Sequence, residues 1–409
     1  MVTQIPGGVL AERFGGKNVF LYPMLIAALS TVLCPLAAKL HVVVFMAVRV
    51  VIGLCQGVVF PAMHSIWSQW APPLERTKLT SITYSGAQIG NVITIPLAAF
   101  LCYYVSWEAV FYVFGLFGFV WCFFWFLIAS NSPNECKRIS RAEQSYINSC
   151  LVGQVKQRKT TVESNNELRK PWLKFLKSGP VWAIVITHTC TNFGTNLVLT
   201  SLPSFMSEVL HLDIKSNGLL SALPYVAFWA GINFAGFMAD FLIRKKILST
   251  TKTRKLHMLI SQFGQAGALI GVGYCEPGQK ILAVALLTLS QGLNGLQYGG
   301  YIVNHVDIAP RFAGTLFGIS NTVATISGIV APFIAASLTP NKTILQWRLV
   351  FIITGAILIF GSLFYALLGS GELQLWAEIP TEAGSEQTET QRGGRAEENL
   401  EGKSNRTSL

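Results

Sequence analysis

Ten long apolar segments constrain the fold of this chain more than any other feature. A membrane-spanning helix needs roughly 20 consecutive, mostly apolar residues. Segments of that kind lie near residues 18–38, 42–70, 81–104, 108–129, 181–206, 218–243, 257–274, 281–306, 314–338 and 349–369. Residues 1–11 read as the end of a further span, too short to cross a bilayer alone. The sequence therefore predicts an all-α polytopic membrane protein with about ten full spans plus part of one.

The composition excludes most other classes of protein. Charged residues make up 12% of the chain and apolar residues 51%, whereas a soluble domain carries about 25% charged residues. The cysteines show no CxxC spacing, so no metal site and no disulfide framework is predicted. No HExxH, GxSxG or P-loop motif is present, which disfavours a membrane enzyme, and no cofactor is expected.

The basic residues indicate the orientation of the spans. If loops are counted alternately, 25 of the 31 Lys and Arg fall on one side of the membrane, including ten in residues 131–180. Only five fall on the other side. This asymmetry predicts that the basic side is cytosolic. It also explains the net charge of +11 without a nucleic-acid partner, because the bases are spread over several loops.

Two polar segments divide the chain into four parts. Residues 1–130 are predicted to form an N-terminal helical bundle, and residues 181–370 a C-terminal one. Between them, residues 131–180 form a basic cytosolic loop. Residues 371–409 hold eight acids against four bases and are predicted to be a disordered cytosolic tail.

The two halves repeat one pattern at a cytosolic span end. Gly8 is followed by Glu12, Arg13 and Lys17, and 228 residues later Gly236 is followed by Asp240 and Arg244. Parallel repeats of this kind build many transporters, with the substrate held near the midplane between the halves. We expect the acids and the nearby bases to pair across helices and to gate the cytosolic face. Simple anchoring by interfacial bases is the alternative.

Several motifs carry a family resemblance, which covers about residues 1–377. The block from Gly8 to Lys17 resembles the signature loop of the major facilitator superfamily. Three further groups resemble its anion:cation symporter branch, the sialin, vesicular glutamate and sodium–phosphate cotransporter family. They are Arg49-Val-Val-Ile-Gly-Leu-Cys-Gln-Gly57, Phe60-Pro-Ala-Met-His64 and Asn304-His-Val-Asp-Ile-Ala-Pro-Arg311. The segments 86–90, 102–104 and 337–340 are most similar to sialin-type members.

The resemblance implies a major facilitator fold of twelve helices in two pseudo-repeated bundles. It also implies that this chain lacks the first helix and part of the second. A monomer in the lipid bilayer is expected, with a small organic anion as substrate. The expected location is a lysosomal, vesicular or plasma membrane.

Arg49 is the only base that falls deep inside a predicted span. A charge at that depth usually faces a cavity or a partner, and a guanidinium matches a carboxylate bidentately. Gly53, Gln56 and Phe60 follow within about 40° of one helical line, with His64 about 60° off it. We therefore expect Arg49 to bind the carboxylate of the substrate. Pairing with an acid on the implied first helix is the alternative.

The coupling ion is left open between H⁺ and Na⁺. Glutamate-transporting and sialin-type relatives typically carry a titratable Glu where this chain has Gln56, and glutamine cannot take up a proton. The sodium–phosphate-type relatives resemble the chain in carrying Gln there. His64, His305 and Asp307 remain candidates for proton linkage.

Further polar residues are placed to line a cavity. Tyr84, Gln88 and Asn91 share one face of a predicted helix, and Asn192 and Asn196 share a face of another. Each of them is a candidate for substrate binding, with helix–helix hydrogen bonding as the alternative.

Three functions follow from these observations. The first is a secondary active transporter of sialic-acid-like organic anions, working by alternating access. The second is a sodium-dependent cotransporter of phosphate or urate-like anions, which Gln56 favours. The remote third is a membrane enzyme or receptor.

Overall fold

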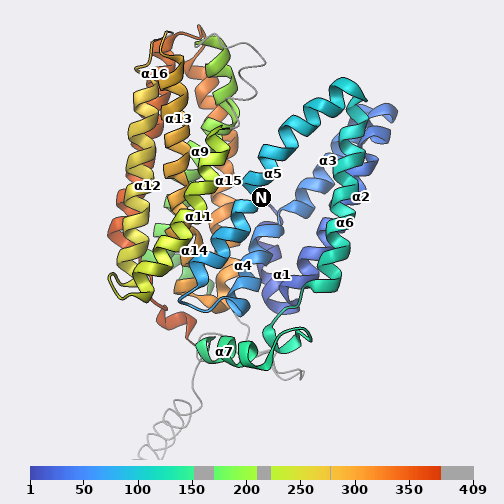
Figure 1. The fold of residues 1–409 in the computed structure, drawn as a ribbon, viewed down its shortest axis with the longest axis vertical. Coiled ribbons are helices and arrows are strands. Elements are labelled where there is room, and N and C mark those ends of the chain that lie inside the picture. The colour runs from blue at the N-terminus through green and yellow to red at the C-terminus, as the bar shows by residue number, and fades with distance from the viewer. Residues whose placement is uncertain (152–169, 210–222, 277, 379–409) are drawn as a thin grey trace, which may run out of the picture.

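The computed structural model describes residues 1–151, 170–209, 223–276 and 278–378. Within this part of the chain the elements are helical, and they form two bundles side by side (Figure 1). The N-terminal bundle holds α1 (Gln4–Phe14), α2 (Gly16–Leu40), α3 (Val42–Gln56), α4 (Val59–Trp70), α5 (Arg76–Tyr104) and α6 (Trp107–Ile128). Seven helical segments in the described ranges are long and apolar enough to span a membrane.

The C-terminal bundle is built from the second half of the chain. Its helices are α9 (Gly179–Glu208), α11 (Leu223–Arg244), α12 (Thr250–Val272), α13 (Lys280–Asn294), α14 (Tyr301–Ile308), α15 (Ala313–Leu338) and α16 (Ile344–Leu368), with 3₁₀ turns η2 (Gly295–Gly299) and η3 (Pro310–Phe312). Apolar residues of α9, α12, α13, α15 and α16 form its main core. Between the bundles in sequence lie η1 (Pro133–Glu135), α7 (Arg141–Leu151) and α8 (Trp172–Lys177), and η4 (Leu375–Ala377) follows the last span.

The predicted span 42–70 is interrupted in the structure. α3 ends at Gln56 and α4 begins at Val59. Pro61 lacks the N–H that would bond to the carbonyl of Gly57. Thr3 also packs here: a Cβ on Gly57 would lie 2.2 Å from Thr3 Oγ1, which donates to the carbonyl of Leu54 at 2.8 Å. The two half-helices still form one apolar stretch of 29 residues.

The predicted continuous span 281–306 is wrong, because α13 and α14 are separated by η2. Glycine allows this break where α11 comes very close to α13. A Cβ on Gly231 would lie 2.0 Å from the carbonyl oxygen of Gly292, and a Cβ on Gly295 would lie 2.6 Å from the carbonyl carbon of Gly231. Only glycine permits backbones to approach this closely.

Two predicted boundaries are also corrected. Helix α12 begins at Thr250 rather than 257, capped by Ser249, whose hydroxyl accepts from the N–H of Lys252 at 3.3 Å. The predicted disordered tail, 371–409, is ordered over residues 371–378. There Gln374 donates its N–H to the carbonyl of Ile308 at 2.9 Å, and Trp376 packs against Phe175. Parts of the predicted segments lie outside the described residues, namely 152–169, 218–222 and 379–409.

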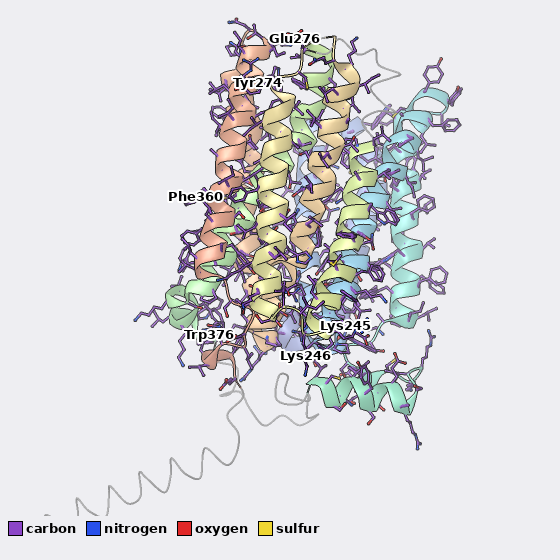
Figure 2. All side chains as sticks on the ribbon, turned by 60° about the vertical axis from the view of Figure 1, so that its left-hand side comes forward. Lys245, Lys246, Tyr274, Glu276, Phe360 and Trp376 are labelled. Atoms are coloured by element: carbon purple, nitrogen blue, oxygen red, sulfur yellow. The ribbon has the colours of Figure 1, made fainter. Side chains whose placement is uncertain are left out.

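The loops rich in Lys and Arg lie at one end of the molecule. Lys245, Lys246 and Trp376 are at that end, whereas Tyr274 and Glu276 are at the other (Figure 2). Helix α7 lies below the bundles at the basic end (Figure 1). The basic residues named here thus lie at the end that the sequence predicts to be cytosolic, and Tyr274 and Glu276 lie at the end that it predicts to be non-cytosolic.

Cys136, between η1 and α7, provides a test of this orientation. The backbone N–H of Arg138 holds the pKa of the Cys136 thiol below its ordinary value, so more reactive thiolate is present near neutral pH. In cells that display the protein at the plasma membrane, a variant that retains only Cys136 should react with a membrane-impermeant maleimide after permeabilisation and not before. Labelling of intact cells at the permeabilised level would place the basic end outside. A Cys136→Ser version of the variant is the control.

Candidate functional site

A cavity of about 170 Å³ lies between the two bundles. Its wall comes from α4 and α5 on one side and from α9, α11, η2, α14 and α15 on the other. The lining residues are Phe60, His64, Tyr84, Gln88, His188, Asn192, Thr195, Phe228, Gln297, Tyr298, Tyr301, Ile302, Phe317 and Asn321.

The lining is polar but carries no permanent charge. None of these residues is an Asp, Glu, Lys or Arg; the polar groups are amides, hydroxyls and imidazoles. Aromatic rings close one end, where the His64 ring stacks on Phe317 at 4.0 Å between centroids and on Tyr84 at 5.3 Å. A mixture of neutral donors and acceptors with aromatic faces suits a ligand that bears hydroxyl or amide groups.

His64 joins the two bundles beneath this cavity. It is 1% exposed, and its Nε2 lies 3.0 Å from the carbonyl oxygen of Ile302 in α14. A carbonyl can only accept, so Nε2 carries the hydrogen. Nδ1 is then the acceptor for the hydroxyl of Tyr84, at 2.7 Å. The carbonyl oxygen of Phe60 also lies 3.1 Å from Nδ1, so this nitrogen would have an acceptor ready if it took up a proton.

Two further histidines extend this hydrogen-bonded cluster. His305 Nδ1 lies 3.1 Å from the same Ile302 oxygen, and its Nε2 lies 2.8 Å from Ser320 Oγ. His188 Nδ1 lies 3.1 Å from Ser320 Oγ. All three imidazoles are buried. Sequence reasoning named His64 and His305 but missed His188, whose position in a predicted span gave the only available signal.

The residues proposed to bind substrate divide into two groups. His64, Tyr84, Gln88 and Asn192 line the cavity. Arg49, Gln56, Asn91 and Asn196 do not belong to its lining. Asn91 donates to Gln88 Oε1 at 3.5 Å, and Asn196 donates to the carbonyl of Asn192 at 2.8 Å, so both contact residues of the wall.

Arg49 lies on α3, outside the cavity and on the face that leads to it. Arg49, Gly53 and Gln56 are exposed, as is Phe60, which reaches the cavity. Arg49 on α3 and Phe60 on α4 lie on opposite sides of the break between the two helices. A Cβ on Gly53 would meet nothing within 4 Å. The space beside α3 one turn from Arg49 is therefore open.

Glu12 closes the basic end of the cavity from the N-terminal bundle. Its carboxylate accepts from the N–H of Thr315 at 2.6 Å and from the Thr315 hydroxyl at 2.7 Å. Thr315 is in the first turn of α15, where the helix dipole favours an anion. Lys170, which precedes α8, forms an ion pair with Glu12, and both side chains are less than 9% exposed.

Asp240 makes the reciprocal contact from the C-terminal bundle. Its carboxylate accepts from the N–H groups of Thr77 and Lys78, at 3.2 and 2.7 Å, in the first turn of α5. Each bundle thus places one carboxylate on a helix N-terminus of the other bundle.

Asp307 lies between two buried arginines. It accepts from Arg76 Nη1 at 3.2 Å and from Arg254 Nε at 2.8 Å. Arg254 also donates through Nη1 to Thr77 Oγ1 and to the carbonyl of Gly299, at 3.0 and 3.1 Å. The three charged side chains are at most 6% exposed, so this network connects α5, α12, η2 and α14 without contact with solvent.

The predicted pairing of the repeated acids is therefore corrected. Glu12 and Asp240 contact helix N-termini, and Lys170 supplies the ion pair instead of Arg13, Lys17 or Arg244. Lys17 packs its ammonium over the ring of Phe126, and Arg244 is exposed. The spacing of charges within one motif does not reveal these contacts, because the helix N-termini and Lys170 meet the acids only when the helices pack together.

Two arginines at this end are buried. The predicted spans 218–243 and 257–274 leave Arg254 in the loop between them, yet it is buried in α12, and Arg76 is buried as well. Asp307, a candidate for proton linkage, is the carboxylate partner of both arginines. Pairing with two cations favours the ionised form of Asp307.

The bundles thus meet at the basic end and diverge at the other, where α3 and α5 lean away from the C-terminal bundle (Figure 1). Side chains on the outer half of α5 are exposed, with Ile93 at 57% and Tyr103 at 82%. The structure is closed on the side that the charges predict to be cytosolic.

Comparison with known proteins agrees with this geometry. The family model of the Major Facilitator Superfamily matches residues 1–332. Human sialin is 44% identical over 377 residues, which cover 92% of this chain and 74% of sialin. Vesicular glutamate transporter 3 of Danio rerio is 40% identical over 379 residues, or 92% of this chain and 63% of that protein. The chain therefore spans less than two thirds of the glutamate transporter's length.

Solved structures show the same fold at low sequence identity. The proton:xylose symporter XylE has a TM-score of 0.69 and 16% identity, with 92% of this chain and 86% of that chain covered. The E. coli fucose:proton symporter FucP has a TM-score of 0.61 and 12% identity, with 89% and 87% covered.

The two bundles, the cavity between them and the acid-bearing repeats define a membrane transporter built from two repeated halves. The chain belongs to the Major Facilitator Superfamily and, within it, to the sialin and vesicular glutamate transporter family. It is a multi-pass membrane protein of a family of transporters, not of enzymes.

Replacing Asp307 tests the buried charge network. Asp307→Asn leaves Arg76 and Arg254 close together without the carboxylate between them, and breaking a buried pair in this way costs about 3–5 kcal/mol. We expect a markedly lower unfolding temperature of the purified protein. Glu372→Gln, which neutralises an exposed acid at the same end, should leave the unfolding temperature unchanged. Equal stability of both variants would show that the network contributes nothing to the closed state.

Proposed function

We propose that this protein is a secondary active transporter of organic anions of the sialic-acid type, moved by alternating access of the two bundles. One observation supports the proposal above all others. The interbundle cavity is lined by neutral amides, hydroxyls and imidazoles together with aromatic side chains. Helix α4, which contributes Phe60 and His64 to it, directly follows α3, on which Arg49 is exposed.

These two features suit the two parts of a sugar acid. Hydroxyl and N-acyl groups of the ligand can bond to Gln88, Asn192, Gln297 and Asn321 in the cavity wall. The carboxylate needs a cation, and Arg49 is the base on the face that leads outward. Arg49 has no ion pair within the described ranges, so its guanidinium can bind a carboxylate bidentately.

The route of the substrate follows from the closed basic end. The substrate would enter from the side opposite the basic loops, pass Arg49 and bind between the bundles. The contacts that Glu12, Asp240 and Asp307 make between the two bundles would then break as the bundles rock and the cytosolic side opens. Human sialin, 44% identical, supports an acidic sugar as substrate and a lysosomal membrane as location. The vesicular glutamate transporters leave a vesicular membrane as the alternative, and the plasma membrane is a third.

Arg49→Ala tests the anion site. Hydrogen bonds to charged groups contribute roughly 1.5–3 kcal/mol, so uptake of N-acetylneuraminate into proteoliposomes should fall roughly ten- to a hundredfold in kcat/KM. The loss should occur at unchanged reconstitution yield. Arg244→Ala removes an exposed base at the cytosolic end and should transport normally. Uptake by Arg49→Ala at the control level would remove Arg49 from the substrate site.

His64 is the proposed site of proton coupling, since Gln56 cannot titrate. Its Nδ1 receives the Tyr84 hydroxyl and faces the Phe60 carbonyl, which would accept the hydrogen of a protonated imidazole. The titratable groups that interact with it include Tyr84 on α5, His305 on α14 and His188 on α9. Because His64 bonds to Ile302 of the other bundle, a proton there would change the contact between the bundles directly.

Sodium coupling is the second candidate for the driving force, favoured by the neutral Gln56 and linked to phosphate or urate-like substrates. Proteoliposomes with imposed gradients separate the two. We expect uptake driven by a pH gradient in sodium-free medium, and we expect His64→Gln to lose that dependence on pH. His41→Gln, at the exposed N-cap of α3, should keep it. A strict sodium requirement with no response to pH would favour the phosphate-type alternative.

A further inference from the structure

Behind the cavity wall, α12 and α13 bring together a group of uncharged polar side chains. We call it the amide cluster: Ser261, Gln262, Gln265, Ser290, Gln291 and Asn294. Its members are at most 5% exposed, and five of the six are fully buried. Apolar residues of the same helices, including Leu269 and Leu287, form the surrounding core. Six polar side chains in the interior of a membrane bundle are costly and suggest a functional role.

Several atoms of the cluster have no hydrogen-bond partner among the described residues. They are Gln262 Oε1, both side-chain polar atoms of Gln265, Ser290 Oγ and Gln291 Nε2. Buried polar groups in native proteins are almost always paired, so each exception needs an explanation. Here the free atoms include two acceptors, two amide donors and a hydroxyl. That balance suits hydroxyl or amide groups, whereas a metal cation would require mainly oxygen ligands.

Helical register places the free atoms close together. Ser261 Oγ donates to the Asn294 carbonyl at 3.3 Å, and a Cβ on Gly264 would lie 2.8 Å from a Leu293 side-chain carbon. Because α12 and α13 are antiparallel, one turn further along brings Gln265 level with Gln291. The cluster thus occupies neighbouring turns of two packed helices.

A chain of hydrogen bonds connects the cluster to the cavity. Asn294 donates to Thr195 Oγ1 at 3.1 Å and accepts from Gln297 Nε2 at 2.8 Å, and both partners line the cavity. Asn294 also lies 3.4 Å from Gln291 Oε1. One residue, Asn294, therefore separates the cavity wall from the unpaired amides.

The helix that forms this part of the wall is broken at this point. Asn294 is the last residue of α13, and Gly295 begins the 3₁₀ turn η2 that breaks the helix before Gly300 and α14. Broken helices at the midplane of transporters supply binding groups and absorb conformational change. Bending at Gly295 would move Asn294 relative to Gln297 and bring the amide cluster into contact with the cavity.

We propose that the amide cluster is an uncharged specificity subsite for the hydroxylated or N-acylated arm of the transported acid. It becomes accessible when the α13–η2–α14 helix bends. The inference rests on the proposed function, since it divides the recognition of one substrate between two places. The anionic group is bound by Arg49 as the substrate enters, and the neutral polar arm is bound by Gln265, Gln291 and their neighbours once the substrate lies between the bundles.

The test measures how strongly two acids of equal charge, added unlabelled, inhibit the uptake of labelled N-acetylneuraminate into proteoliposomes. N-acetylneuraminate carries hydroxyl and N-acyl groups, and benzoate carries neither. In Gln265→Met and Gln291→Met, the inhibition constant of N-acetylneuraminate should rise about tenfold, because an apolar group cannot pair with the ligand's hydroxyls. The constant of benzoate should stay within about twofold of the wild-type value.

The variants are chosen so that folding does not obscure the result. Methionine has nearly the shape of glutamine, and exchanging an unpaired buried amide for it should hold or raise the unfolding temperature. Thr354→Val is the matched control. Its hydroxyl is fully buried on α16, which packs against α12, and bonds within its own helix to Val350 at 2.8 Å. It should leave both inhibition constants unchanged.

Each other outcome has a distinct meaning. Equal changes for both acids would show that the cluster acts only through the packing of the bundle, and no change for either acid would show that no ligand reaches it. Both results overturn the subsite. If the wild-type protein is inhibited by neither acid, the proposed function itself fails, and that result is seen before any variant is measured.

Discussion

The seam between the two bundles depends on three carboxylates that are buried at the basic end. Glu12 and Asp240 each accept hydrogen bonds from the first turn of a helix in the opposite bundle. Asp307 joins Arg76 of one bundle to Arg254 of the other. Removed from water, such contacts are strong when complete and costly when one partner is missing. They therefore join the two bundles at this end of the molecule.

The closed seam gives the cavity its position and its chemistry. The charged groups lie in the contacts at the basic end, whereas the lining of the cavity combines neutral amides, hydroxyls and imidazoles with apolar side chains such as Phe228 and Phe317. His64 lies at the boundary, with one ring nitrogen toward Ile302 of the far bundle and the other toward Tyr84 of its own. A change in the protonation of one residue can thus affect the contact between the bundles. The glycine-containing break after Asn294 interrupts the helix in the same wall.

Sequence reasoning succeeded where a residue's environment follows from its neighbours in the chain. The length of the apolar runs predicted the spans, and the side of the basic residues matched the end at which their loops lie. Tyr84 and Gln88 share a helical face, and both reach the cavity. The same reasoning could not find His188 or Lys170, because their partners Ser320 and Glu12 are 132 and 158 residues away. It also read α13 and α14 as one span, since the contact of Gly231 with Gly292 is tertiary.

The sequence by itself determined the class of protein, a helical membrane protein, and the division of its chain into two halves. It predicted ten full spans, of which seven segments in the described ranges are long and apolar enough to cross a membrane. Those properties follow from hydrophobic length, charge asymmetry and repetition, which are read along the chain. Tertiary structure alone decided the partners of the charges. Arg254, which counts as a loop base in the sequence, is fully buried beside Asp307, whereas Arg49, the base within a span, lies exposed on α3. The reason is physical: burial and pairing depend on which helices pack together, and no single helix specifies its neighbours.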